Sequence, residues 1–133
     1  MKNYSQIYLI DDFDMSNLIH KALIRKLQVA AEINAFTNPE KALADLRIKI
    51  GKSERILILL DINMPEMSGF EFLDIMEKEA FPHNIDVIIV TSSISEKDRT
   101  KAKEHSQFVI DFITKPLKLN QLSTVLKPLY RAG

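Results

Sequence analysis

The chain has 133 residues, of which 46% are hydrophobic and 27% charged, and its 18 basic and 18 acidic side chains give zero formal net charge. This composition predicts one globular domain with its core at about residues 5–128, and the balanced charge provides no global field for nucleic acid or an anionic membrane. The absence of cysteine excludes disulfides and thiolate metal sites. Because a signal peptide and a membrane-length apolar run are both missing, we expect a cytoplasmic protein without membrane insertion.

Five short apolar runs alternate with stretches of helical or polar character. We expect strands at residues 7–10, 31–36, 56–60, 87–90 and 108–113. Helices are expected at about residues 14–27, 38–50, 68–79, 95–105 and 119–127. The run at 56–60 is apolar throughout, which is typical of a strand buried on both faces. This alternation predicts an α/β domain, in which helices cover both faces of a parallel sheet.

The first helix has an apolar periodicity that predicts which side chains it buries. The predicted buried face carries Met15, Leu18, Ile19, Ala22, Leu23 and Leu27. Ile24 lies outside this stripe, so we expect it to be exposed. Asp14 is the expected N-cap residue, because its side-chain oxygen could accept a hydrogen bond from the first turn.

Capping signals place the ends of the later helices. Asn38 precedes Pro39, which suits the first helical position because a missing N–H costs nothing there, and Gly51 suits the end of that helix. Pro128 should end or bend the last helix, because its ring clashes with a carbonyl one turn earlier. Two further helices begin at a serine with an acid three residues later. These pairs are Ser68 with Glu71, which has capping-box spacing, and Ser95 with Asp98.

Other charged side chains are expected at the surface. The polar helix after Ser95 should present a solvated basic face made of Lys97, Arg99, Lys101 and Lys103. The histidines lack metal-ligand spacing to one another and are also expected to be exposed. They are His20, His83 and His105.

Polar side chains follow four of the five predicted strands. These residues are Asp11, Asp12, Asp61, Thr91 and Lys115. Because the carboxyl ends of parallel strands lie at one edge of a sheet, we expect these groups to meet there. Three carboxylates this close need a cation, and oxygen ligands favour a hard ion such as Mg²⁺, or else Mn²⁺. The predicted site is therefore metal-dependent.

A carboxylate beside such a cation can act as a nucleophile toward phosphorus and form an aspartyl phosphate. Asp61 is the expected nucleophile because its strand is central. The pair Asp11-Asp12 is expected to hold the metal, while Lys115 and the Thr91 hydroxyl supply a positive charge and a hydrogen bond to a phosphoryl group.

Four motifs together resemble the receiver domain of two-component response regulators over nearly the whole chain. They are residues 9–12 (Leu-Ile-Asp-Asp), 61–69 (Asp-Ile-Asn-Met-Pro-Glu-Met-Ser-Gly), 91–93 (Thr-Ser-Ser) and 112–116 (Phe-Ile-Thr-Lys-Pro). The resemblance implies a doubly wound, flavodoxin-like (βα)5 fold with strand order 2-1-3-4-5. We find no sequence signal of an output domain, so residues 1–133 are expected to form a single receiver domain.

The resemblance also implies a role for each site residue. Asp61 would be the phosphoacceptor, phosphorylated in a Mg²⁺-dependent reaction by the phosphohistidine of a sensor histidine kinase or a histidine phosphotransfer protein. The implied metal ligands are Asp11, Asp12, Asp61 and the backbone carbonyl of Asn63. Lys115 would contact the phosphoryl group, next to a cis bond to Pro116. Thr91 and Phe112 would be the switch pair, and Asn63 and Ser93 would tune the phosphoryl lifetime.

Such a switch is not an enzyme beyond accepting and hydrolysing its own phosphoryl group. It would act on a protein target, or pass the phosphoryl group onward, as a monomer or a phosphorylation-dependent dimer, without binding nucleic acid directly. Three features depart from the common pattern, one of which is Pro128, which shortens or bends the last helix. Phe108-Val109 stand where many receivers have Gly-Ala, and Phe112 replaces the usual Tyr, so its ring has no hydroxyl.

Three other functions fit parts of the pattern. A phosphatase of the haloacid dehalogenase type also forms an aspartyl phosphate, but it needs an acid where this chain has Asn63. A flavodoxin-like binding protein needs a phosphate-cradling loop where Asp11-Asp12 would repel phosphate. A receiver-like interaction module that is never phosphorylated would have no use for the acids, Thr91 and Lys115.

Overall fold

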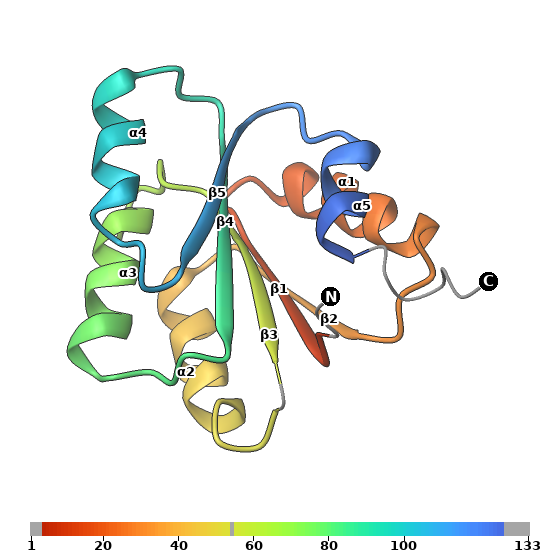
Figure 1. Ribbon diagram of the computed structural model, residues 1–133, viewed down its shortest axis with the longest axis horizontal. Coiled ribbons are helices and arrows are strands. Elements are labelled where there is room, and N and C mark those ends of the chain that lie inside the picture. Colours follow the sequence, from red (N-terminus) through yellow and green to blue (C-terminus); the bar gives the residue numbers. More distant parts are fainter. Residues whose placement is uncertain (1–3, 54, 127–133) are drawn as a thin grey trace.

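The computed structural model describes residues 4–53 and 55–126, and it contains one sheet between two layers of helices (Figure 1). The strands are β1 (Gln6–Ile10), β2 (Glu32–Phe36), β3 (Ile56–Leu60), β4 (Ile85–Thr91) and β5 (Val109–Thr114). The helices are α1 (Asp14–Lys26), α2 (Pro39–Lys49), α3 (Gly69–Lys78), α4 (Glu96–Lys103) and α5 (Leu119–Leu126). All neighbouring strands pair in parallel in the order β2-β1-β3-β4-β5, so the predicted fold is confirmed.

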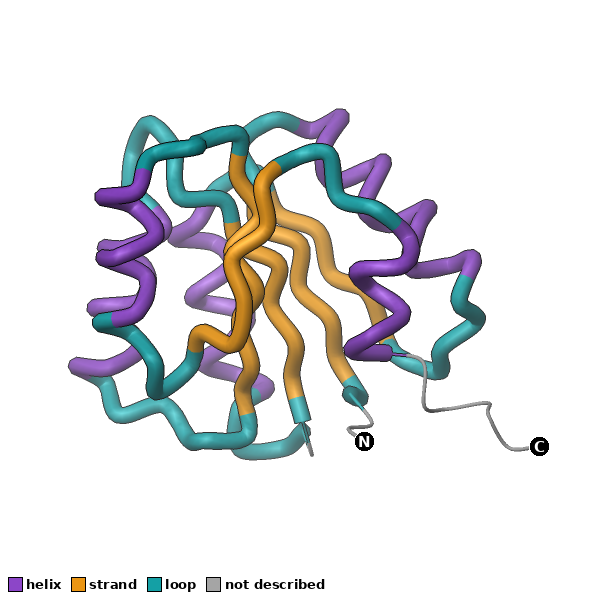
Figure 2. Tube along the Cα trace, turned by 45° about the horizontal axis from the view of Figure 1, so that its top comes forward, coloured by secondary structure: helices purple, strands orange, loops and turns teal. Residues whose placement is uncertain are grey.

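Helices cover both faces of the sheet (Figure 2). A hydrophobic core lies on each face, because successive side chains of a strand point to opposite sides. Ile56, Ile58 and Leu60 of β3 belong to the core that packs against α2, α3 and α4. Leu57 and Leu59 belong to the core that packs against α1 and α5. Every residue of β3 and β4 is buried, which explains the continuous apolar runs at 56–60 and 87–90, although β4 also buries the polar residues Asp86 and Thr91.

The strand β5 forms one edge of the sheet and carries an irregularity. Val87 pairs with Val109, but the next residue of β4, Ile88, pairs with Asp111. Ile110 is therefore an extra residue between two paired positions, as in a β-bulge. Its side chain is 45% exposed.

The buried face of α1 differs from the prediction. Met15, Leu18 and Ile19 are 51%, 62% and 52% exposed. The residues that α1 buries are Ser16, Asn17, His20 and Ile24. The Asn17 amide donates hydrogen bonds to the backbone carbonyls of Asp11, at 3.2 Å, and Phe36, at 3.0 Å. These bonds give the Asn17 side-chain nitrogen two partners inside the core, whereas its buried Oδ1 has none among the described residues. The apolar periodicity therefore indicated the wrong face for Met15, Leu18 and Ile19, while Leu27 is buried as predicted and Leu23 packs against the core.

We expect Ile24→Val to destabilise the fold by about 1 kcal/mol, because removing one buried methylene group loses burial and leaves a small void. The same change at the exposed Ile19 should stay within about 0.5 kcal/mol of the parent protein. Urea denaturation of both variants measures the difference. Equal losses at the two positions would contradict the observed orientation of α1.

Most of the predicted helix starts are confirmed. Asn38 Oδ1 accepts hydrogen bonds from the amides of Glu40 and Lys41, at 2.9 and 3.2 Å. The Ser68–Glu71 capping box is complete. The Ser95 hydroxyl oxygen accepts from the Asp98 amide at 3.3 Å.

Other predicted ends differ. Asp14 is not the N-cap of α1, because Phe13 occupies that position without a side-chain cap and its amide donates to Asp11 Oδ1 at 2.9 Å. The end of α2 agrees with the predicted span of about 38–50, but its C-cap is Ile50 and not Gly51, which has no positive φ. Pro128 lies outside the described residues. No helix in the described part of the chain is long and apolar enough to cross a membrane.

Two of the three histidines are buried, contrary to expectation. His20 and His105 are each 5% exposed, whereas His83 is exposed. His20 is buried on α1, and its burial lowers the pKa of the imidazole, with a smaller lowering by the Lys115 charge that Asp11 partly offsets. The prediction that these histidines are exposed was based only on the absence of metal-ligand spacing. That spacing carries no information about packing against other parts of the chain.

Candidate functional site

The carboxyl ends of β1 and β3 bring two aspartates together. Ile10 pairs with Leu60, so Asp11 and Asp61 each follow a strand at the same level of the sheet. The Asp61 amide donates to the Ile10 carbonyl at 3.0 Å. Both side chains are buried, at 3% and 6% exposure, whereas Asp12 is exposed. One carboxylate oxygen from each of the three aspartates lies within 4.8 Å of the other two, as the sequence predicted.

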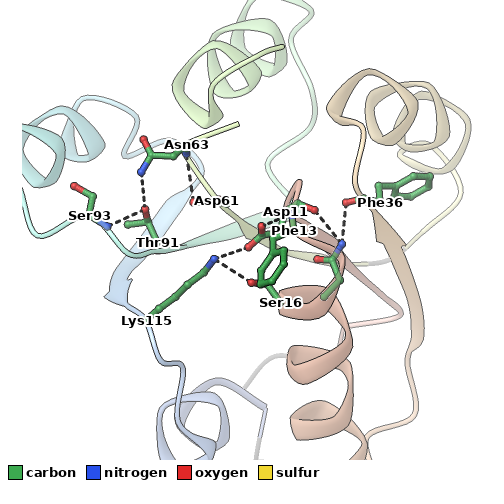
Figure 3. A network of polar contacts seen from close by, with 10 residues as sticks. Asp11, Phe13, Ser16, Phe36, Asp61, Asn63, Thr91, Ser93 and Lys115 are labelled. Carbon is green, nitrogen blue, oxygen red and sulfur yellow. Dashed lines mark hydrogen bonds and ion pairs between the residues drawn. The ribbon is translucent and has the colours of Figure 1, made fainter. Parts of the chain in front are cut away.

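Lys115 joins this cluster from the end of β5 (Figure 3). Its Nζ lies 2.7 Å from Asp11 Oδ2 and 3.3 Å from the Ser16 hydroxyl. The Lys115 amide donates to the Thr91 carbonyl at 2.7 Å, and the Lys115–Pro116 peptide bond is cis. Ser16 was not predicted from the sequence, although its position in the first turn of the helix that follows Asp11 is a usable signal.

Asn63 and Thr91 form the other side of the site. The Asn63 amide donates to Asp61 Oδ1 at 3.3 Å, and the Asn63 side chain donates to the Thr91 hydroxyl at 3.4 Å. The Ser93 amide also donates to this hydroxyl, at 3.2 Å. Thr91 is fully buried. Asp61 therefore lies between Asp11 with Lys115 on one side and Asn63 with Thr91 on the other (Figure 3).

The electrostatics of the site favour a cation. Burial raises the pKa of the Asp61 carboxyl, and the neighbouring Asp11 charge raises it further. Lys115 and the hydrogen bonds from Asn63 and Thr91 offset part of this increase. The protein alone therefore does not fully stabilise the negative charge of an ionised Asp61. A divalent ion would supply the missing charge, and carboxylate oxygens are the ligands that Mg²⁺ prefers, so these residues fit a magnesium ion.

Ser93 connects the site to α4. Its hydroxyl donates to Asp98 Oδ2 at 2.6 Å, and the Ser95 amide donates to the Ser93 oxygen at 3.2 Å. A continuous chain of hydrogen bonds thus extends from Asp61 through Asn63, Thr91 and Ser93 to the first turn of α4. The contact with Asp98 was not predicted from the sequence, which indicated only a capping role for that region.

Phe112 lies on β5 and is partly buried. The Arg99 guanidinium of α4 lies 4.8 Å from the ring centroid, a cation–π distance. The predicted basic face of α4 is exposed, but Arg99 also contacts this ring, and Lys101 lies over Phe70 at 4.9 Å. Phe108, the first departure from the common pattern, is fully buried in the core shared with α3 and α4.

The model of the response regulator receiver domain family matches residues 7–127. The chain belongs to this family. It is a receiver domain of the two-component type, and its flavodoxin-like sheet order is the one expected of such a domain.

The relatives of this receiver domain include larger proteins. The sensor histidine kinase CheAY of Helicobacter pylori is 33% identical over 128 residues, which cover 95% of this chain and 15% of that protein. The phosphate regulon transcriptional regulatory protein PhoB of Klebsiella pneumoniae is 35% identical over 75 residues, which cover 56% of this chain and 32% of that protein. The receiver domain therefore spans well under half the length of either curated relative.

Solved structures of receivers share its fold. The crystal structure of a two-component response regulator from Cytophaga hutchinsonii superimposes with a TM-score of 0.82 at 28% identity, over 93% of this chain and 95% of that one. A response regulator receiver domain from Rhodospirillum rubrum gives a TM-score of 0.71 at 26% identity, over 93% and 89% of the two chains.

Proposed function

We propose that Asp61 is the phosphoacceptor of this receiver domain. The observation that carries the proposal is its place at the centre of the sheet edge, buried among Asp11, Asn63, Thr91 and Lys115. A carboxylate oxygen of Asp61 would attack the phosphorus of a phosphohistidine. The new O–P bond forms as the P–N bond breaks, and the histidine nitrogen leaves with the electron pair.

The residues around Asp61 have complementary roles in this proposal. Asp11, Asp12 and Asp61 would hold Mg²⁺ through their carboxylates, together with the backbone carbonyl of Asn63. When bound, the ion neutralises charge that develops on the phosphoryl oxygens. Lys115, now paired with Asp11, would turn its ammonium group toward the phosphoryl group, which adds about −1.5 to −2 charge as it does on hydroxyl residues.

Thr91 and Phe112 are proposed as the switch pair. The Thr91 hydroxyl would leave its two donors, Asn63 and Ser93, and donate to the phosphoryl group. The Ser93 bond to Asp98 would pass this movement to α4, whose Arg99 covers the Phe112 ring. We propose that Asn63 and Ser93 also tune the phosphoryl lifetime, because both contact Thr91 beside Asp61.

The side-chain amide of Asn63 also argues against a phosphatase of the haloacid dehalogenase type. An amide cannot protonate a leaving group as a carboxylic acid can, so turnover would be limited to hydrolysis of the receiver's own phosphoryl group.

The partners are proposed from the surface beside the site. Phe13, Met15, Leu18 and Ile19 expose apolar side chains on and just before α1, next to Asp11 and Asp12. Such a patch suits a protein partner that must approach Asp61 closely, namely a sensor histidine kinase or a histidine phosphotransfer protein. The phosphorylated domain would then bind a downstream protein or pass the phosphoryl group to another histidine.

We expect acetyl phosphate to label the protein only when a divalent ion is present. Labelling is measured as a shifted band on a phosphate-affinity gel, with Mg²⁺ in one sample and a chelator in the other. Removing the ion should abolish the band, because no cation then balances the negative charges of Asp11, Asp12 and Asp61 or those of the incoming phosphoryl group. Mn²⁺ should restore it. Equal labelling in chelator would contradict the magnesium site, and no labelling by either acetyl phosphate or a phosphohistidine donor would favour the unphosphorylated interaction module.

A further inference from the structure

A second group of side chains with metal-ligand chemistry lies away from the aspartate edge. Asp74 and Glu77 are three residues apart on α3, so they share one face of that helix. His105 lies in the segment between α4 and β5 and faces them. One potential ligand atom from each of the three residues lies within 4.8 Å of the other two.

The His105 ring is held in one orientation. Its side chain is only 7% exposed. The ring stacks on Phe70, with centroids 5.9 Å apart and an angle of 20° between the planes. Its Nδ1 lies 2.8 Å from Glu77 Oε2, which places a proton on Nδ1 and makes it the donor to the carboxylate.

The other ring nitrogen has no hydrogen-bond partner among the described residues. His105 Nε2 is 3.8 Å from Asp74 Oδ1, which is too far for a hydrogen bond. In the neutral ring with its proton on Nδ1, Nε2 carries a lone pair. This lone pair faces the Asp74 carboxylate, and a cation bound by both atoms would use the lone pair and compensate the carboxylate charge.

We propose that Asp74, Glu77 and His105 form a second divalent-cation site, suited to Zn²⁺ and similar transition metals. His105 Nε2 and Asp74 Oδ1 are the direct protein ligands, and water completes the coordination. Glu77 holds the ring through Nδ1, as carboxylates do behind metal-bound histidines. Two metal–ligand bonds of about 2.0–2.2 Å each can span the gap. Asp74 is 64% exposed, so its side chain is free to adjust.

The chemistry of the ligands separates this site from the magnesium site. Imidazole nitrogen suits Zn²⁺, Cu²⁺ and Ni²⁺, whereas Mg²⁺ prefers oxygen ligands and keeps its waters. Excess Mg²⁺ can therefore occupy the aspartates that follow β1 and β3 without filling the site at His105.

A metal at this position would join α3 to the start of β5. The His105 carbonyl accepts hydrogen bonds from the amides of Phe108 and Val109, both at 3.0 Å. Fixing His105 to Asp74 would therefore restrain the segment that leads from α4 into β5. This restraint depends on α3 and not on phosphorylation of Asp61.

Zn²⁺ titration by calorimetry in excess Mg²⁺ tests the proposal, with the imidazole resonances of His105 followed by NMR. We expect one Zn²⁺ site whose saturation shifts the His105 signals. Asp74→Asn and His105→Gln should weaken binding at least about 10-fold, because each removes a direct ligand, and Glu77→Gln should weaken it about 10- to 100-fold. The exposed Glu104→Gln, one residue from His105, is the matched control and should bind as the parent does.

Two results would overturn the site. One is unchanged Zn²⁺ affinity in Asp74→Asn, which keeps the test decisive even if His105→Gln fails to fold, because Asp74 is mostly exposed. The other is saturation with Zn²⁺ without any shift of the His105 resonances. This result would show that the metal binds elsewhere and that His105 contacts only the carboxylates of Glu77 and Asp74. Labelling of Asp61 by acetyl phosphate should be the same in Asp74→Asn as in the parent protein, so the two proposals fail separately.

Discussion

Asp61→Asn is expected to abolish labelling by acetyl phosphate completely, at every Mg²⁺ concentration. The amide has the size of the carboxylate but is no nucleophile toward phosphorus, and it also removes one of the three proposed metal ligands. A phosphate-affinity gel, with intact-protein mass spectrometry as a second measurement, compares the variant with the parent. No other residue of the site should have so large an effect.

The control for this variant makes the same chemical change at an exposed acid. Asp111→Asn lies on β5, outside the aspartate cluster, and should be labelled as the parent is. If Asp61→Asn were still labelled at the parental rate, the phosphoacceptor would have to be another residue.

Stability gives an independent measurement on Asp61→Asn. The raised pKa of Asp61 means that the folded protein disfavours its ionised form. Ionisation therefore destabilises the native state above the folded pKa, and this penalty is relieved as the pH falls through it. Without divalent ions at neutral pH, the free energy of unfolding of the variant should be larger than that of the parent. Added Mg²⁺ should reduce this difference, because the ion would stabilise the parent more than a variant that lacks one of the proposed ligands.

Gly69→Ala is expected to destabilise the fold by about 1–3 kcal/mol or more. A Cβ at this position would lie 2.6 Å from the Asp61 carbonyl oxygen and 2.8 Å from the Ile62 Cα, and backbone atoms cannot rotate away as side chains do. The Gly69 amide also donates to the Ile62 carbonyl at 3.1 Å, so a shift of α3 would strain this bond as well. Urea denaturation measures the loss.

Gly51, the other glycine among the described residues, provides the control. Nothing lies within 4 Å of a Cβ built on Gly51, and its φ is not positive. Gly51→Ala should therefore be neutral or stabilise the protein by up to about 1 kcal/mol, by restricting the unfolded chain. Similar losses at Gly51 and Gly69 would show that the close approach to Asp61 is not the cause. Because that contact involves the Asp61 backbone, Gly69→Ala should also slow phosphorylation.

Local signals predicted the strands and most helix starts because each depends on residues that are close in sequence. The buried run at 56–60 and the Ser68–Glu71 box are examples. The clustering of Asp11 with Asp61 could also be predicted, because parallel strands place their carboxyl ends at one edge. These features need no knowledge of which helix face packs inward.

The failures have a common physical origin in contacts between distant segments. Asn17 is buried because carbonyls of Asp11 and Phe36 accept from it, and no periodicity within α1 carries that information. His105 is buried because residues of α3 surround it. The Ser93–Asp98 hydrogen bond likewise could not be predicted, because it depends on the conformation of the loop before α4.

We expect the extra residue in β5 to limit association through this edge of the sheet at high concentration. An edge strand offers unpaired amide and carbonyl groups to any other extended chain, and a long flat edge is a template for aggregation. Because Ile110 interrupts the regular spacing of these groups, a second strand cannot align along the full length of β5. The β5 edge can thus keep an exposed isoleucine and still resist pairing with a second strand.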